Sequence, residues 1–164
     1  MTSNRNARLT AALAIAAALA LDLLVKHLFL AHAATWNGAT LIPGLLDAHY
    51  AWNHGVSFSL FWQSSSFGGG LLAALLLAVI VALAVAAFRT PRPLTAAGYG
   101  IIAGGALGNI ADRLQHGAVF DFLLLHLGAW PLFICNSADI FISLGVVLLA
   151  ADTWRAERKL QPAS

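Results

Sequence analysis

Two aspartates late in the chain carry the clearest chemical signal, because each lies in an apolar run where a carboxylate is costly. Asp121 is flanked by Phe120 and Phe122, and Asp139 follows Asn136 at the start of a largely apolar stretch. An ionisable residue at membrane depth marks a functional site by default. Two carboxylates that meet share a proton, so this pair predicts general acid–base chemistry.

A further group of polar residues repeats one pattern, an Asn followed three residues later by an Asp. Asn109 precedes Asp112 and Asn136 precedes Asp139, and residues three apart project from one face of a helix. Arg113 adds a fixed cation directly after the first of these pairs. We expect the two faces to converge near one membrane surface. A polar helix end with an Asp–Arg pair is the structural alternative for the first of them.

Asp22 and Lys26 interrupt the first apolar stretch of the chain. They lie four residues apart, so they share one helix face and can pair. The pair is either a structural ion pair inside a helix bundle or a support that shapes an active site from behind. The spacing alone leaves both interpretations open.

Other catalytic schemes lack their residues. The sequence has no His-Glu-x-x-His motif and its six histidines are scattered, so a zinc protease would lack its ligands. There is also no Gly-x-Ser-x-Gly motif and no phosphate-binding glycine loop. Cys135, the single cysteine, lies in an apolar run and is expected to act as a small hydrophobic side chain. We therefore expect neither a metal nor a cofactor.

The composition is that of an integral membrane protein. Of the 164 residues, 60% are hydrophobic and only 10% are charged, whereas soluble domains carry about 25% charged residues. The basic residues form no stripe, and the net charge is only +2, so the pattern predicts no nucleic-acid partner. The length favours a single membrane domain over residues 1–164.

Four apolar stretches are long enough to cross a bilayer as helices, which takes roughly 20 residues each. They cover approximately residues 9–30, 69–88, 94–111 and 132–151. Seven of the nine Lys and Arg residues form three clusters: before the first stretch, between the second and third, and after the fourth. Because basic loops favour the cytoplasm, both termini should be cytoplasmic, and the Asn–Asp pairs should lie near the outer face.

A cleaved signal peptide is the alternative for the first stretch. The segment 31–33, Ala-His-Ala, resembles a cleavage site. Against cleavage, the apolar run is long and Asp22 and Lys26 interrupt it. Its loss would also separate the basic clusters across the membrane.

The segment between the first two spans, about residues 36–67, has the pattern of a small outer sheet. Turn signals divide it, and the runs 50–52 and 56–59 between them are strand-like. The expected fold is therefore a membrane all-α domain of four transmembrane helices, with a small extracytoplasmic β-sheet between the first and second helices. A short outer loop over about 112–131 would carry Asp121. Three aromatic residues suit the membrane interface, namely Trp36, Trp52 and Trp62.

Along almost its whole length the chain resembles the bacterial lipoprotein signal peptidases, also called signal peptidase II. The resemblance rests on five motifs that occur in order within the four-span layout. They are Asp22 with Lys26, Asn53–Phe58, Gly104–Arg113, Val119–Phe122 and Asn136–Asp139. Two positions depart from the family pattern: Leu23 stands where Gln is usual, and Cys135 stands where Phe usually precedes the Asn.

The resemblance implies an aspartyl endopeptidase of the bacterial inner membrane, with Asp121 and Asp139 as its catalytic pair. It implies a diacylglyceryl-modified prolipoprotein as substrate, cut just before the lipidated cysteine. The two lipid chains would anchor that substrate in the bilayer. We expect a monomer in contact with membrane lipids. The substrate-binding or supporting residues are expected to be Asp22, Lys26, Asn53, Gly55, Phe58, Asn109, Asp112, Arg113 and Asn136.

Asp112 competes for a place in the catalytic pair. The adjacent Arg113 should keep it ionised, which suits a positioning role better than proton transfer.

A small proton-coupled membrane transporter is the alternative function, because intramembrane Asp and Asn residues also mark ion pathways. Four spans without an inverted repeat offer little for alternating access, and the polar residues gather at one face. A structural membrane subunit with paired aspartates is the third interpretation.

Overall fold

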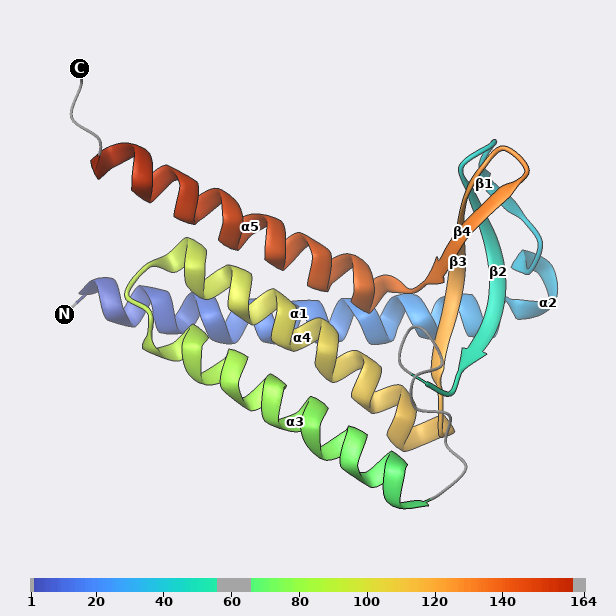
Figure 1. The fold of residues 1–164 in the computed structure, drawn as a ribbon, viewed down its shortest axis with the longest axis horizontal. Coiled ribbons are helices and arrows are strands. Elements are labelled where there is room, and N and C mark those ends of the chain that lie inside the picture. Colours follow the sequence, from blue (N-terminus) through green and yellow to red (C-terminus); the bar gives the residue numbers. More distant parts are fainter. Residues whose placement is uncertain (1, 56–65, 161–164) are drawn as a thin grey trace.

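In the computed structural model, which describes residues 2–55 and 66–160, long helices run alongside one another and a small sheet closes one end (Figure 1). The long helices are α1 (Thr2–Ala31), α3 (Ser66–Arg89), α4 (Pro93–His116) and α5 (Ser137–Leu160). Within the described residues, three helices, α1, α4 and α5, are long and apolar enough to cross a membrane. The fold is thus that of a mostly helical, multi-pass membrane protein, and a fourth span through α3 stays a prediction.

The central helix is α4, which packs against α1, α3 and α5. Its glycines make this possible: a Cβ at Gly100 or Gly104 would come within 2.9 or 2.6 Å of a backbone oxygen of α1. A Cβ at Gly105 would come within 2.8 Å of a backbone oxygen of α5. The close packing predicted from the small residues of this span is therefore confirmed.

The start of α1, the end of α5 and the turn between α3 and α4 lie at one end of the bundle, and the sheet lies at the other (Figure 1). The three basic clusters consequently share the end opposite the sheet, as their spacing predicted. Which side of the membrane this end faces stays a prediction.

The sheet has four antiparallel strands in the order β1-β2-β3-β4. Strands β1 (Thr40–Ile42) and β2 (Leu46–Asn53) follow the short helix α2 (Ala33–Trp36). Strands β3 (Val119–Leu127) and β4 (Trp130–Cys135) come from between α4 and α5. The expectation that the sheet lies wholly between the first two helices is therefore wrong. The strand-like run 50–52 falls in β2 as predicted, whereas the run 56–59 lies outside the described residues.

Two predicted boundaries also change around the second half of the sheet. The expected loop over 112–131 is instead the end of α4 followed by β3, and Gly117 makes the turn with φ 74°. The expected fourth span at 132–151 begins later, because residues up to Cys135 are strand and α5 starts at Ser137. The first three predicted spans lie inside α1, α3 and α4.

A cluster of aromatic side chains packs the sheet against the end of α1. Phe120 and Phe122 of β3 are buried, and the Phe122 ring lies 4.2 Å from that of Phe29 between centroids. The Tyr50 hydroxyl of β2 donates a hydrogen bond of 2.8 Å to the Phe29 carbonyl. Because β3 also carries Asp121, this packing fixes one of the two predicted catalytic residues relative to the bundle.

Candidate active site

Asp121 lies within β3, not in a loop as expected, and is only 5% exposed. Asn53 Nδ2 donates to its Oδ2 at 3.0 Å, and Asn136 Nδ2 donates to its Oδ1 at 2.5 Å. Asn53 reaches it because Asp121 pairs with Ala51 in β2, and alternate residues of a strand share a face. Both carboxyl oxygens are thus held by amide groups from two different elements.

Asp139 is the third residue of α5, and its carboxylate is bound at the N-terminus of this helix. Its Oδ2 accepts the Asn136 backbone N–H at 3.1 Å, while its own N–H donates to Asn136 Oδ1 at 3.2 Å. This reciprocal arrangement is a capping box, with Asn136 as the N-cap. The positive end of the helix dipole favours a negative charge at this position.

Asn136 therefore joins the two predicted catalytic residues. Its amide nitrogen binds Asp121, and its amide oxygen binds the backbone of Asp139. Asn109 of α4 adds a second restraint, because its Nδ2 donates to Asp139 Oδ1 at 3.3 Å. The sequence predicted that the two Asn–Asp faces converge, and three of their four members meet here.

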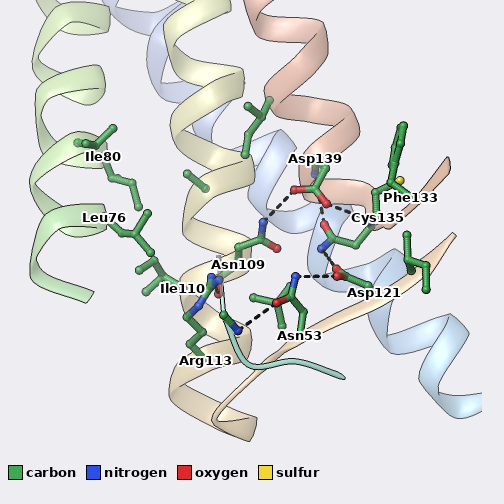
Figure 2. A pocket seen from close by; sticks show the side chains of 17 residues that line it. Asn53, Leu76, Ile80, Asn109, Ile110, Arg113, Asp121, Phe133, Cys135 and Asp139 are labelled. Atoms are coloured by element: carbon green, nitrogen blue, oxygen red, sulfur yellow. Dashed lines mark hydrogen bonds between the residues drawn. The ribbon is translucent and has the colours of Figure 1, made fainter. Parts of the chain in front are cut away.

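Asp121 and Asp139 line one cavity of about 520 Å³, which is bounded by the sheet and by α3, α4 and α5 (Figure 2). Its other polar lining comes from residues predicted to support catalysis, namely Asn53, Gly55, Asn109, Arg113 and Asn136. Its apolar lining includes branched side chains of the bundle, namely Leu76, Val79, Ile80 and Ile142. The cavity thus combines two carboxylates with an apolar wall.

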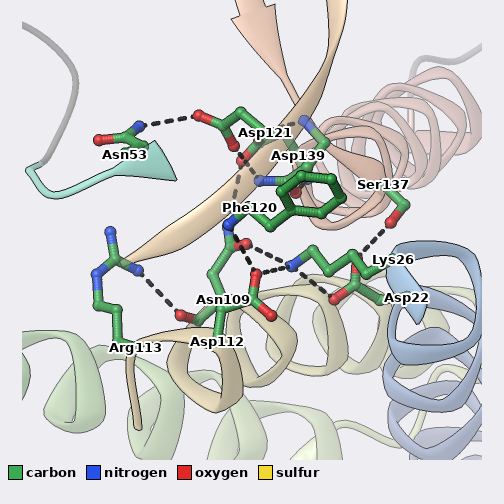
Figure 3. Close-up of polar contacts among 11 residues, drawn as sticks. Asp22, Lys26, Asn53, Asn109, Asp112, Arg113, Phe120, Asp121, Ser137 and Asp139 are labelled. Carbon is green, nitrogen blue, oxygen red and sulfur yellow. Dashed lines mark hydrogen bonds and ion pairs between the residues drawn. The ribbon is translucent and has the colours of Figure 1, made fainter. Parts of the chain in front are cut away.

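Beside this site, Lys26 of α1 is 4% exposed and contacts three oxygens (Figure 3). Its Nζ lies 2.9 Å from Asp22 Oδ2 and 2.9 Å from Asp112 Oδ2. It also donates a hydrogen bond of 2.9 Å to Asn109 Oδ1. The predicted Asp22–Lys26 pair is confirmed, and it extends to the helix that carries Asn109.

Asp112 faces Lys26 rather than lining the cavity with Asn109. The structural alternative for this motif was an Asp–Arg pair at the helix end, whereas the ion pair that Asp112 makes is with Lys26, across two helices. Asp112 Oδ2 also accepts the backbone N–H of Phe120 at 3.2 Å. Phe120 directly precedes Asp121, so Asp112 holds the strand that presents the catalytic candidate.

Arg113 lines the cavity, and its expected role in binding substrate stays a prediction. Its Nη1 donates a hydrogen bond of 3.1 Å to the backbone oxygen of Asn109, one turn earlier in α4. This bond ties the guanidinium to α4, one of the helices that line the cavity.

Two contacts of Asp22 were not predicted from the sequence. The Ser137 hydroxyl donates to Asp22 Oδ1 at 2.5 Å and so ties α5 to α1. A Cβ on Gly108 would overlap the Asp22 carboxyl group, so only glycine leaves room for this carboxylate. Ser137 lies inside the recognised Asn136–Asp139 motif, but its partner lies 115 positions earlier in the chain and has no local signal.

Gly55 and Phe58 were the remaining expected supporting residues. The Gly55 N–H donates to Asn53 Oδ1 at 3.1 Å, which turns the Asn53 amide nitrogen toward Asp121. Phe58 lies outside the described residues.

Burial sets the protonation behaviour of the groups that the sheet contributes. The pKa of the Asp121 carboxyl is raised, chiefly because burial disfavours its charged form, although hydrogen bonds from Asn136 and Asn53 oppose the shift. The negative charge of Asp139 adds to the increase. Burial also raises the pKa of the Cys135 thiol to about 11, so this cavity residue is neutral, in keeping with its predicted apolar role.

No group of three or more His, Cys, Asp or Glu side chains is placed to hold a metal ion among residues 2–55 and 66–160. The carboxylates of the cavity are bound instead by amide and backbone N–H donors.

Comparison with known proteins gives one consistent result. The family profile described as signal peptidase (SPase) II matches residues 14–155. The chain is 46% identical over 109 residues to the lipoprotein signal peptidase of Methylorubrum extorquens, covering 66% of this chain and 64% of that protein. It is 38% identical over 151 residues to the lipoprotein signal peptidase of Mesorhizobium japonicum, covering 89% and 88%.

Solved structures agree on the fold. A bacterial membrane enzyme determined at 2.3 Å by the in meso method superposes with a TM-score of 0.75 at 19% identity, covering 94% of this chain and 93% of that one. A second, determined at 1.9 Å, gives a TM-score of 0.72 at 21% identity, with 94% of each chain covered. With the family profile spanning most of the sequence and its motifs gathered around one cavity, the chain belongs to the signal peptidase II family.

Proposed function

We propose that the chain is an aspartic endopeptidase that removes the signal peptide from diacylglyceryl-modified prolipoproteins, cutting just before the lipidated cysteine. The observation that carries the proposal is the cavity into which Asp121 and Asp139 both open, with Asn136 bonded to each. Membership of a peptidase family supports this function over a proton-coupled transporter.

The environments of the two carboxylates favour different roles. Burial raises the pKa of Asp121, which favours this residue over Asp139 as the acid that polarises the scissile carbonyl. Asp139 lies at the first turn of α5 and accepts two N–H donors, an arrangement that suits the base that takes a proton from the attacking water. The resulting hydroxide adds to the carbonyl carbon, and Asp121 donates its proton to the former carbonyl oxygen, which gives a gem-diol. Collapse then breaks the C–N bond: Asp139 passes the water-derived proton to the leaving amine, and Asp121 takes a proton back from one hydroxyl of the gem-diol.

The neighbouring groups fit peptide positioning. Asn53 and Asn109 hold the catalytic carboxylates through their amide nitrogens, and Arg113 presents a cation to the same cavity. We propose that Arg113 binds a backbone carbonyl of the substrate. Lys26, Asp22 and Asp112 would act from behind, because they hold α4 and β3 without lining the cavity.

The apolar side of the cavity supports a lipid-bearing substrate. Leu76, Val79 and Ile80 of α3 line the cavity, as does Ile142 of α5. Such a wall is as apolar as the lipid tails of a bilayer, so acyl chains can lie against it without contacting a polar group. We therefore propose that the diacylglyceryl group lies between α3 and α5, with the cleavage site beside the carboxylates.

The same proposal includes the arrangement in the bacterial inner membrane. Four spans would place both termini and the basic end of the bundle in the cytoplasm, because positive residues favour that side. The sheet and the cavity would then lie at the outer face. We propose a monomer, since one chain supplies both carboxylates and the groups that hold them.

Cleavage of a synthetic diacylglyceryl-modified lipobox peptide by the purified protein tests the function. Asp121→Asn and Asp139→Asn should each abolish cleavage, because each removes one proton-transfer group. Asp152→Asn is the matched control: it alters an aspartate at the other end of the bundle, beside Arg92. Near-wild-type turnover in either cavity variant would refute the assignment. Inhibition by EDTA that zinc reverses would refute a metal-free reaction.

A further inference from the structure

A second cavity of about 520 Å³ lies at the basic end of the bundle, away from the catalytic cavity. It is an open groove between α1 and α3, and no role in peptide cleavage accounts for it. Its lining consists of two arginines and four apolar residues, namely Arg8, Val81, Ala84, Val85, Phe88 and Arg89.

The groove exists because small residues bring the two helices together beside it. Ala7 and Ala11 of α1 are fully buried in one cluster with Ala87 of α3. Arg8 and Phe88, which directly follow Ala7 and Ala87, line the groove beside this contact. Figure 1 shows this end of α3 lying near the beginning of α1.

One wall of the groove is an apolar stripe on α3. Val81, Val85 and Phe88 recur every three or four residues, so they lie on one face of the helix. They are exposed by 53%, 40% and 40% respectively. The stripe runs along the bundle axis, which is the direction of an acyl chain in a bilayer.

The basic end of the stripe carries two cations that the protein does not neutralise. In the described part of the chain, neither Arg8 nor Arg89 makes an ion pair with a carboxylate. Arg92 differs, since its guanidinium lies 2.8 Å from Asp152 Oδ1. Of the arginines at this end, the two that line the groove are thus available for an external anion.

We propose that this groove binds an anionic phospholipid, with the phosphate between Arg8 and Arg89 and an acyl chain along the α3 stripe. A guanidinium pair matches a phosphodiester in charge and in hydrogen-bond donors. Juxtamembrane basic residues favour anionic lipids by several-fold each. The site would hold α1 and α3 together at the end where alanines provide the direct contact.

Native mass spectrometry of the purified protein in detergent tests the site with two probes, phosphatidylglycerol and phosphatidylcholine of identical acyl chains. The wild-type protein should bind phosphatidylglycerol about 10 to 30 times more tightly. Arg8→Gln/Arg89→Gln should reduce this preference to about threefold or less. Inorganic phosphate at millimolar concentration should not displace the lipid, because it lacks the acyl chain; displacement would identify a free-phosphate site and refute lipid binding.

The matched control is Arg5→Gln/Arg155→Gln, which removes the same charge from exposed arginines outside the groove. It should keep the wild-type preference. Ala84→Phe, which fills the groove, should weaken binding of both lipids. Equal loss in the control pair would mean that net charge alone acts, and wild-type affinity in Ala84→Phe would show that the chain lies elsewhere. Either result would overturn the proposal, provided that circular dichroism shows each variant folded.

Discussion

Replacement of Lys26 by Met tests whether the buried cation holds the site together. The substitution keeps most of the side-chain volume but removes a charge that contacts two carboxylates and one amide oxygen at 2.9 Å each. Asp22 is fully buried and Asp112 is 6% exposed, so water cannot replace the lost partner. Breaking a buried ion pair by removing one member costs about 3–5 kcal/mol.

That loss should be visible as a fall in thermal stability. For a chain of this length, 1 kcal/mol corresponds to about 2–4 °C, so the midpoint should fall by about 6–20 °C. Circular dichroism of the protein in detergent at neutral pH measures it. Peptide turnover should also fall by at least about tenfold, because Asp112 no longer fixes the strand that carries Asp121.

Two variants show whether the reasoning is correct. Arg92→Met breaks an ion pair of similar length, 2.8 Å, whose arginine side chain is 46% exposed, and should cost about 1 kcal/mol or less. Lys26→Met/Asp112→Asn removes one stranded charge and should recover part of the loss, with a coupling of about 1–3 kcal/mol. A Lys26→Met variant as stable as Arg92→Met would refute the argument, as would strictly additive losses in the double variant.

Three further outcomes are expected. Gly108→Ala should destabilise the protein by about 1–3 kcal/mol, because the added methyl group overlaps the Asp22 carboxyl. Gly→Ala in a helix usually stabilises a protein, so a raised melting temperature would contradict this prediction. Because burial raises the pKa of Asp121, kcat/KM should fall as pH rises through that pKa and the acid loses its proton. The free energy of unfolding should fall over the same pH range, because the folded state holds this proton more tightly than the unfolded state. A rate that stayed constant up to the loss of folding would contradict the acid role. Asn136→Ala should lower the stability by about 1 kcal/mol, because the helix loses its N-cap. It should also lower turnover of the lipobox peptide by at least about tenfold. Unchanged turnover would show that Asn136 does not orient the carboxylates.

The sequence predicted the helices and the polar motifs well because these depend on local patterns. Long apolar runs, basic clusters and the glycines of α4 are all visible without a structure. The second half of the sheet was missed for a physical reason. β3 and β4 are rich in consecutive apolar residues rather than alternating ones, and such runs do not distinguish a buried strand from part of a helix. Pro131 and Gly128 were the available signals for a hairpin, and Gly128 adopts φ 57° at the turn.

The supporting contacts show the same limit. The spacing of Asp22 and Lys26 predicted their pairing, because both lie on one helix face. Nothing local could indicate that Lys26 also contacts Asp112 and Asn109, which lie in α4. Because strand β3 was not predicted, Asp121 was expected in a loop near water, whereas it lies in a buried strand.

The capping box at the start of α5 couples the first turn of this helix to the position of the Asp139 carboxylate. The backbone N–H groups of Asn136 and Asp139 are each bound to a side-chain oxygen of the other residue. Fraying of the first turn of α5 would therefore release Asp139 and the Asn136 amide from the cavity at the same moment. Hydrogen–deuterium exchange at these two amides should consequently follow the assembly and loss of the proposed catalytic arrangement directly, in the absence of any substrate.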